Sequence, residues 1–242
     1  MRVSCFECAL RACGLFKPVS QDELASINDL KRDHVAVPAG TEIIRAGQDS
    51  AELYTLYSGW AFRFKNLPDG RRQILNFLLP GDLLGLQAAM FDVAQHGIEA
   101  LTEVELCLLP QHKVWELFGR APELAFDVTW LGAREESHVD ENLLSTGRRT
   151  AAERIAALIV ILYKRADALG LVADKTFVFP LSQQHIADAL GLSLVHTNKT
   201  LARLRRMGMY TQTNGSLTLT NPRVLERIAQ HFDAELARRP LI

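Results

Sequence analysis

The segment from Leu181 to Arg206 decides the fold of the C-terminal region, and it reads LSQQHIADALGLSLVHTNKTLARLRR. Ser182 is a favourable N-cap for a first helix, and Gly191 is suited to end that helix because glycine adopts positive φ without strain. Ser193 begins a second helix almost at once, and this helix continues to Arg206. Two short helices joined by a glycine-containing turn predict a helix-turn-helix.

A β-hairpin is expected directly after these two helices. Asn214-Gly215 lies between alternating polar and apolar residues in the segment Met209–Thr220, and this dipeptide is the strongest short-range signal for a hairpin. A helix-turn-helix followed by a hairpin predicts a winged helix. Residues 148–242 carry 14 basic and 7 acidic side chains, whereas residues 1–147 carry 13 and 21. The net charge of −1 therefore conceals a basic C-terminal part, which is a hint of nucleic-acid binding.

The second helix of the pair can be divided into two faces. Thr197, Leu201 and Leu204 recur at intervals of four and three, so we expect them to face the core. Asn and Lys on the opposite face can read base edges in a major groove, although a solvated polar face of an ordinary helical domain would show the same charges. The predicted DNA-binding residues are Ser182, Gln183, Gln184, Ser193 and His196 at helix starts, Val195, Asn198, Lys199 and Arg203 on the outer face, and Arg205 and Arg206 beyond it.

Residues 34–110 have a sequence pattern typical of β-strands, unlike the helical pattern of the C-terminal region. Short segments rich in β-branched and aromatic residues alternate there with glycine turns, and three of them are Leu53–Tyr57, Ala61–Lys65 and Gln73–Leu79. Many short strands at such spacing predict an all-β sandwich or barrel. A helix over residues 20–32 is expected before this region, because Ser20 and Glu23 have the spacing of a capping box.

A long helix is predicted from Pro122 to about residue 146. Apolar residues keep an approximate spacing of three to four along it, from Leu124 and Val128 to Val139 and Leu143. Such a stripe fits either a helix packed on its own barrel or the seam of a dimer. The segment Gly147–Thr150 is the expected hinge before the next helix.

In this order, the segments resemble the CRP/FNR family of bacterial transcription regulators. The residues that carry the resemblance are Leu79–Gly85 in the β-rich region, Thr150–Ala156 after the long helix and Ile186–Leu201 in the helix-turn-helix. The resemblance implies an α+β fold of three parts. Residues 1–121 would form a sensor β-roll of cyclic-nucleotide-binding type with an N-terminal cysteine segment, residues 122–147 a dimerisation helix, and residues 148–242 a winged-helix DNA-binding domain.

The resemblance also implies the partners. A homodimer would read a pseudo-palindromic operator on double-stranded DNA, with half-sites about one helical turn apart, and RNA polymerase is a further expected partner. Val195 and Lys199 stand where the best-known members carry an acidic residue and an arginine, so their operator sequences do not transfer. Cyclic-AMP binders carry a Glu where Leu86 stands and an Arg-Ser pair where Asp92–Gly97 falls. We therefore expect no binding of cyclic AMP.

Four cysteines suggest a signal of another kind: Cys5, Cys8, Cys13 and Cys107. Oxygen-sensing members of the family hold an iron–sulfur cluster with three N-terminal cysteines and one in the last strands of the β-roll, and four thiolates suit a [4Fe–4S] cluster. The second N-terminal gap here is one residue shorter than in that pattern. Simple thiols with a redox response, or a zinc site, stay open as alternatives.

Composition excludes some functions. No apolar run approaches the roughly 18–20 residues that span a bilayer, and the N-terminus has no apolar stretch typical of a secretory signal. We expect a cytoplasmic protein that does not act at a membrane and is not an enzyme. One alternative is a cyclic-nucleotide-binding-type module that acts through protein partners. The other is a cupin-like enzyme, which would need clustered metal ligands that His34, His96 and His112 do not form in the sequence.

Overall fold

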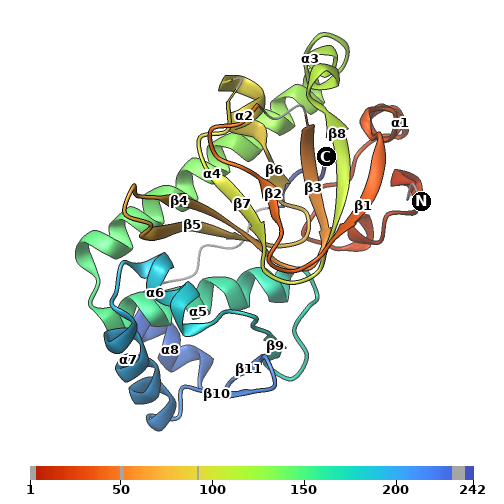
Figure 1. Ribbon diagram of the computed structural model, residues 1–242. Coiled ribbons are helices and arrows are strands. Elements are labelled where there is room, and N and C mark those ends of the chain that lie inside the picture. The colour runs from red at the N-terminus through yellow and green to blue at the C-terminus, as the bar shows by residue number, and fades with distance from the viewer. Residues whose placement is uncertain (1–3, 50–51, 92, 231–237) are drawn as a thin grey trace. The chain divides into compact units, whose positions relative to one another are not determined.

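The computed structural model describes residues 4–49, 52–91, 93–230 and 238–242 (Figure 1). Asp92, the first residue of the stretch compared with the cyclic-AMP-binding pattern, lies outside the described residues. The chain divides into two compact units. Unit 1 comprises Met1–Lys65, Asn76–Ser137 and Arg238–Ile242, and unit 2 comprises Asn66–Leu75 and His138–Ala237.

Two four-stranded antiparallel sheets form the β-roll, as the alternation of short strands and glycine turns predicts. One sheet has the order β1-β8-β3-β6 and the other β2-β7-β4-β5. A core that includes Leu56, Ile98 and Leu106 fills the roll. The strands are β1 (Asp33–Val37), β2 (Glu42–Ile44), β3 (Glu52–Ser58), β4 (Ala61–Asn66), β5 (Arg72–Leu78), β6 (Leu83–Leu84), β7 (Gly97–Ala100) and β8 (Val104–Pro110).

Short helices flank the roll in unit 1. The predicted capping box is present, because Ser20 Oγ accepts from the Glu23 N–H and the Glu23 carboxylate accepts from the Ser20 N–H. The helices are the 3₁₀ turns η1 (Cys5–Glu7) and η2 (Ala9–Ala12), α1 (Gln21–Leu30), α2 (Leu86–Phe91) and α3 (Gln111–Arg120), followed by the long α4 (Pro122–Arg148).

The two halves of helix α4 differ in burial. Leu124, Val128 and Leu131 are buried in a core shared with α1, α3 and β8. Val139 and Leu143 lie further along the helix and are exposed, Leu143 by 70%. The first half of α4 therefore packs within unit 1, and the second half carries exposed apolar side chains. Gly147, which was expected in the hinge, is still helical, so the break falls at Arg149 and Thr150.

Unit 2 contains the expected winged helix. Its three-stranded sheet has the order β10-β11-β9, and Thr150 caps α5 through a capping box with Glu153. The elements are α5 (Ala151–Ala168), β9 (Thr176–Val178), α6 (Gln183–Leu190), α7 (Leu194–Arg206), β10 (Tyr210–Thr213), β11 (Ser216–Leu219) and α8 (Pro222–Ala229).

The residues Arg238–Ile242 return to unit 1, which no sequence pattern indicated. Arg239 forms an isolated parallel β-bridge with Phe16, and both Leu241 and Ile242 are buried. We refer to the residues from Arg239 to Ile242 as the C-terminal strap.

Candidate nucleic-acid interface and cysteine pocket

Hydroxyl caps and one left-handed glycine set the helix-turn-helix. Ser182 Oγ accepts from the His185 N–H at 3.1 Å, and Ser193 Oγ accepts from the His196 N–H at 3.2 Å. Gly191 has φ +63°, a conformation that costs a residue with a Cβ about 1–2 kcal/mol. The serine oxygens serve as acceptors within the caps. The first-turn N–H groups that remain free of helical partners are suited to phosphate.

Helix α7 has the two faces that its sequence predicts. Thr197, Leu201 and Leu204 are buried, whereas Val195, Lys199 and Arg203 are exposed. Asn198 is half-buried, and its Oδ1 has no hydrogen-bond partner among the described residues. The exposed row of α7 therefore offers one apolar side chain, one amide edge and two cations along a single helix surface. Arg205 and Arg206 are exposed at its C-terminal end.

The hairpin forms a wing fastened to α7. Asn214 and Gly215 both have positive φ, at +50° and +76°, as a two-residue primed turn requires. Tyr210 OH donates to the Leu201 carbonyl oxygen at 3.1 Å, which joins the wing to the buried face of α7. The exposed Gln212, Thr213 and Asn214 at the tip are polar candidates that our sequence reasoning missed. Their position next to the predicted Asn214-Gly215 turn could have identified them.

One predicted DNA-binding side chain is engaged within its own helix. Gln184 Nε2 donates to Asp188 Oδ1 at 2.6 Å, an i,i+4 pair on α6. Gln183 is exposed at the start of the same helix. The structure therefore brings the predicted residues of α6 and α7 onto one motif, and Gln183 is the freer of the two glutamines.

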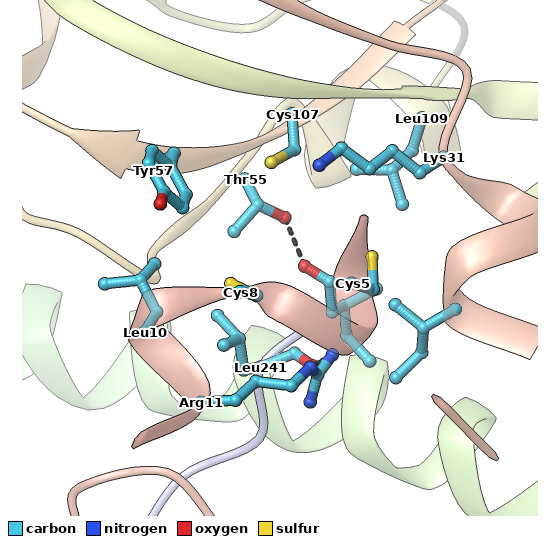
Figure 2. A pocket seen from close by; sticks show the side chains of 12 residues that line it. Cys5, Cys8, Leu10, Arg11, Lys31, Thr55, Tyr57, Cys107, Leu109 and Leu241 are labelled. Carbon is cyan, nitrogen blue, oxygen red and sulfur yellow. Dashed lines mark hydrogen bonds between the residues drawn. The ribbon is translucent and has the colours of Figure 1, made fainter. Parts of the chain in front are cut away.

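Three of the four cysteines line a pocket in unit 1 (Figure 2). Cys5 and Cys8 come from the N-terminal turns, and Cys107 lies on β8 opposite His34 of β1 and Thr55 of β3. Lys31 and Arg11 also line the pocket, together with Leu241 and Ile242. Thr55 Oγ1 donates to the main-chain oxygen of Ile242, as the dashed line in Figure 2 shows.

The pocket opposes ionisation of the Cys107 thiol. Burial raises the pKa of Cys107, and a hydrogen bond from Lys31 acts in the opposite direction. Burial also lowers the pKa of Arg11, while the thiols of Cys5 and Cys8 act to raise it. Two basic side chains beside three thiols make a site where a thiolate, once formed, has a cationic partner.

The described residues do not assemble a metal site at these cysteines. Cys13 does not line the pocket, whose volume is about 20 Å³, room for one or two water molecules. In the part of the chain that the structure describes, no group of three or more His, Cys, Asp or Glu side chains is placed to hold a metal ion. A [4Fe–4S] cluster needs four converging thiolates, so the residues as folded do not fit it.

A second polar cluster in unit 1 was also missed. Arg63 of β4 pairs with Glu135 of α4 at 2.7 Å, and Asn76 Nδ2 donates to the same carboxylate at 3.4 Å. Burial, with the cations of Arg63 and Lys65, lowers the pKa of His96 to about 4. His96 is therefore held neutral. Polar residues spread over two strands, a loop and a distant helix leave no signal in the sequence.

A β-roll, a long helix and a winged helix together define a class of DNA-binding protein. The chain matches the cyclic nucleotide-binding domain over residues 34–121 and the Crp-like helix-turn-helix domain over residues 153–228. It is 30% identical to the nitrogen fixation regulation protein FixK of Bradyrhizobium diazoefficiens over 93% of both chains. The chain belongs to the CRP/FNR family of DNA-binding transcription regulators.

Other relatives agree with this assignment. The transcriptional activator protein FnrL of Cereibacter sphaeroides is 28% identical over 85% of this chain and 83% of its own. The structure of FixK2 from Bradyrhizobium japonicum superposes with a TM-score of 0.73 at 26% identity, covering 85% of this chain and 98% of that one. The α+β fold with a β-roll and a winged helix is thereby confirmed. No helix in the described ranges is long and apolar enough to cross a membrane.

Proposed function

We propose that the protein is a homodimeric transcription activator that reads a pseudo-palindromic operator and responds to a signal at its β-roll other than cyclic AMP. In this proposal residues 1–121 sense, residues 122–147 dimerise and residues 148–242 bind DNA, in the cytoplasm, and the protein is not an enzyme. Activation would involve contact with RNA polymerase. The exposed row of α7, held by a complete buried face, is the observation that carries the proposal.

Dimerisation is supported by the second half of α4. Val139 and Leu143 are one helical turn apart and exposed, and Leu144 beside them is 51% exposed. Exposed apolar side chains repeated along one stripe of a helix are typical of a surface that another helix covers. The occupant proposed here is α4 of a second copy, which would set two recognition helices on one DNA face.

The DNA contacts divide into two kinds. Val195, Asn198, Lys199 and Arg203 would face base edges in the major groove, where amide and cationic side chains discriminate between bases. The remaining predicted residues would contact phosphates, where binding is independent of sequence and weakens with salt. These phosphate contacts are Ser182, Gln183, Gln184, Ser193, His196, Arg205 and Arg206.

We further propose that the pocket thiols receive the signal as a redox or thiol-reactive stimulus. The cations of Lys31 and Arg11 beside Cys5, Cys8 and Cys107 support this assignment. An iron–sulfur cluster on Cys5, Cys8, Cys13 and Cys107 is the alternative. It would require Cys13 to move in and the pocket to enlarge.

The DNA-binding proposal is tested by selecting binding sites from a random duplex library with the purified full-length protein. Enrichment of a two-fold symmetric site with affinity that falls steeply with salt supports it. The absence of enrichment over a scrambled library would overturn it. Absorption near 400 nm and stoichiometric iron after anaerobic purification would identify the cluster instead of free thiols. Micromolar binding of cyclic AMP in titration calorimetry would contradict the assignment of the signal.

A further inference from the structure

The C-terminal strap is anchored by a buried arginine. Arg239 is 2% exposed, its Nη1 pairs with Asp82, and its Nη2 donates to the Pro80 carbonyl oxygen at 2.8 Å. Its guanidinium also lies 5.0 Å from the centre of the Phe16 ring. The carboxylate, the carbonyl and the aromatic face hold the two terminal nitrogens and the plane of the guanidinium, while its Nε has no hydrogen-bond partner among the described residues. Three such contacts make a specific attachment.

Backbone and side-chain hydrogen bonds continue the attachment along the strap. The Arg239 N–H donates to the Leu15 oxygen, and the Lys17 N–H donates to the Arg239 oxygen, both at 2.9 Å. Arg11 Nη2 donates to the Leu241 oxygen at 3.0 Å, and Thr55 holds the Ile242 oxygen. The strap is thus bonded to the N-terminal segment along one side and to β3 at its end.

The apolar end of the strap is a wall of the cysteine pocket. Leu241 and Ile242 line the pocket together with Cys5, Cys8 and Cys107 (Figure 2). Ile242 also packs in the core cluster that contains Cys5, Val128 of α4 and Leu109 of β8. The other walls include β3 and β8, which are paired with each other and with further strands in a sheet. The strap has no such sheet around it.

The strap and helix α4 share one buried carboxylate. Asp82 accepts from Arg239, and Arg134 Nη1 of α4 lies 3.3 Å from the same Oδ1. Lys17, whose amide bonds the strap, pairs through its side chain with buried Asp127 of α4. Movement of the strap would therefore alter two ionic contacts of the helix proposed to dimerise.

We propose that the C-terminal strap covers one side of the cysteine pocket, and that a group added to the buried thiols of Cys5 and Cys107 displaces it. The pocket has room for about one or two water molecules, so a thiomethyl group added to buried Cys5 or Cys107 competes with the pocket walls for that room, because protein interiors are close-packed. The strap is the wall that moves, since the strands are held by their ladders. This inference rests on the proposed signal site at the thiols. It does not depend on DNA binding, which none of its readouts measures.

Amide exchange on the full-length chain tests the displacement. The probe is methyl methanethiosulfonate, from which a thiolate takes an S–CH₃ group while methanesulfinate leaves. In the Cys13→Ser variant, labelling of the pocket thiols is expected to speed exchange of the Lys17 and Arg239 amides by roughly tenfold or more. The matched control replaces Cys5, Cys8 and Cys107 with Ser, so that only Cys13 reacts, and exchange is expected to be unchanged. Unchanged exchange after full labelling of the pocket thiols overturns the proposal.

A second arm opens the strap and measures thiol access. Arg239→Ala should raise the labelling rate of the pocket thiols by roughly tenfold or more, while Arg238→Ala, an exposed neighbour in the same segment, leaves it unchanged. Thr55→Val removes only the hydroxyl that holds Ile242 and should give a smaller increase even if Arg239→Ala fails to fold. Equal labelling rates in wild type and Thr55→Val, with Cys13 labelling as internal reference, contradict the closure.

Discussion

The recognition helix and the cysteine pocket are organised in opposite ways. Helix α7 takes both its faces from 13 consecutive residues, so its function is a matter of local periodicity. The pocket collects its lining from the N-terminal turns, α1, two strands and the last two residues. Local order makes α7 tolerant of changes elsewhere, whereas the pocket depends on contacts between distant segments.

The largest expected effect is a loss of stability when a contact between distant segments of unit 1 is removed. Asp82→Ala leaves Arg239 without its buried carboxylate partner and removes the contact of Arg134. Breaking a buried ion pair from one side costs about 3–5 kcal/mol, to be measured by urea unfolding. Asp69→Ala, which removes an exposed pair with Arg71, should cost less than about 1 kcal/mol. Equal losses of unfolding free energy in the two variants would show that the ion pairs of Asp82 do not stabilise unit 1 more than an exposed pair does.

The next effect concerns DNA binding by helix α7, whose two faces follow from local sequence. Lys199→Ala is expected to weaken specific DNA binding by about 1–3 kcal/mol if the amine contacts a base, with no change in thermal stability because Lys199 is exposed. Arg206→Ala is the comparison, since a phosphate contact lowers affinity for all sequences and reduces the salt slope by about 1. Fluorescence anisotropy with selected and scrambled duplexes separates the two. An unchanged ratio of specific to non-specific affinity in Lys199→Ala would exclude it from base readout.

A pH-dependent effect comes from the buried polar cluster in unit 1. Because the pKa of His96 is lowered to about 4, the folded state disfavours its protonation relative to the unfolded chain. The resulting stability is complete above the unfolded value of about 6.5 and is lost as pH falls toward 4. Between pH 7 and 5 the wild type should lose about 2 kcal/mol that His96→Gln does not lose. His112→Gln, at an exposed position, should follow the wild type, and parallel curves for all three proteins would refute the assignment.

The smallest effect concerns the turn between α6 and α7. Gly191→Ala places a Cβ on a residue with φ +63°, which should cost about 1–2 kcal/mol of stability. Gly147→Ala is the matched control, because Gly147 is helical and an added Cβ would meet no other atom within 4 Å. This substitution should stabilise the protein by about 0.5–1 kcal/mol. Thermal melts of both variants measure the two stability changes. An unchanged stability in Gly191→Ala would show that the turn accommodates a Cβ without strain.

Most of the winged helix could be predicted because its signals are local. Ser182 and Ser193 act as caps, Gly191 is left-handed, and Asn214-Gly215 turns the wing, all as their residue types require. The β-roll was predictable as a class from glycine spacing. The strand order of the roll was not predictable, because its first strand β1 pairs with its last strand β8. Pairing between strands so far apart in the sequence depends on loop closure and shared burial.

The candidate sites divide along the same line. The predicted DNA-binding residues share one motif in the structure, and their contacts stay a prediction. The cysteine set stays a prediction too, and the structure brings together only Cys5, Cys8 and Cys107. The short second gap between Cys8 and Cys13 noted in the sequence concerns the cysteine that does not line the pocket.

The sequence by itself determined the elements, the two helix faces, the charge division and the membership of a regulator family, since each follows from residue type and spacing along a short stretch. Only the tertiary structure decided that Arg239 meets Asp82, 157 positions away, and that Leu241 and Ile242 close the space beside three thiols. A buried ion pair and a pocket wall are set by which surfaces exclude water together. Such contacts between distant residues form only in the folded chain, so no single segment of the sequence predicts them.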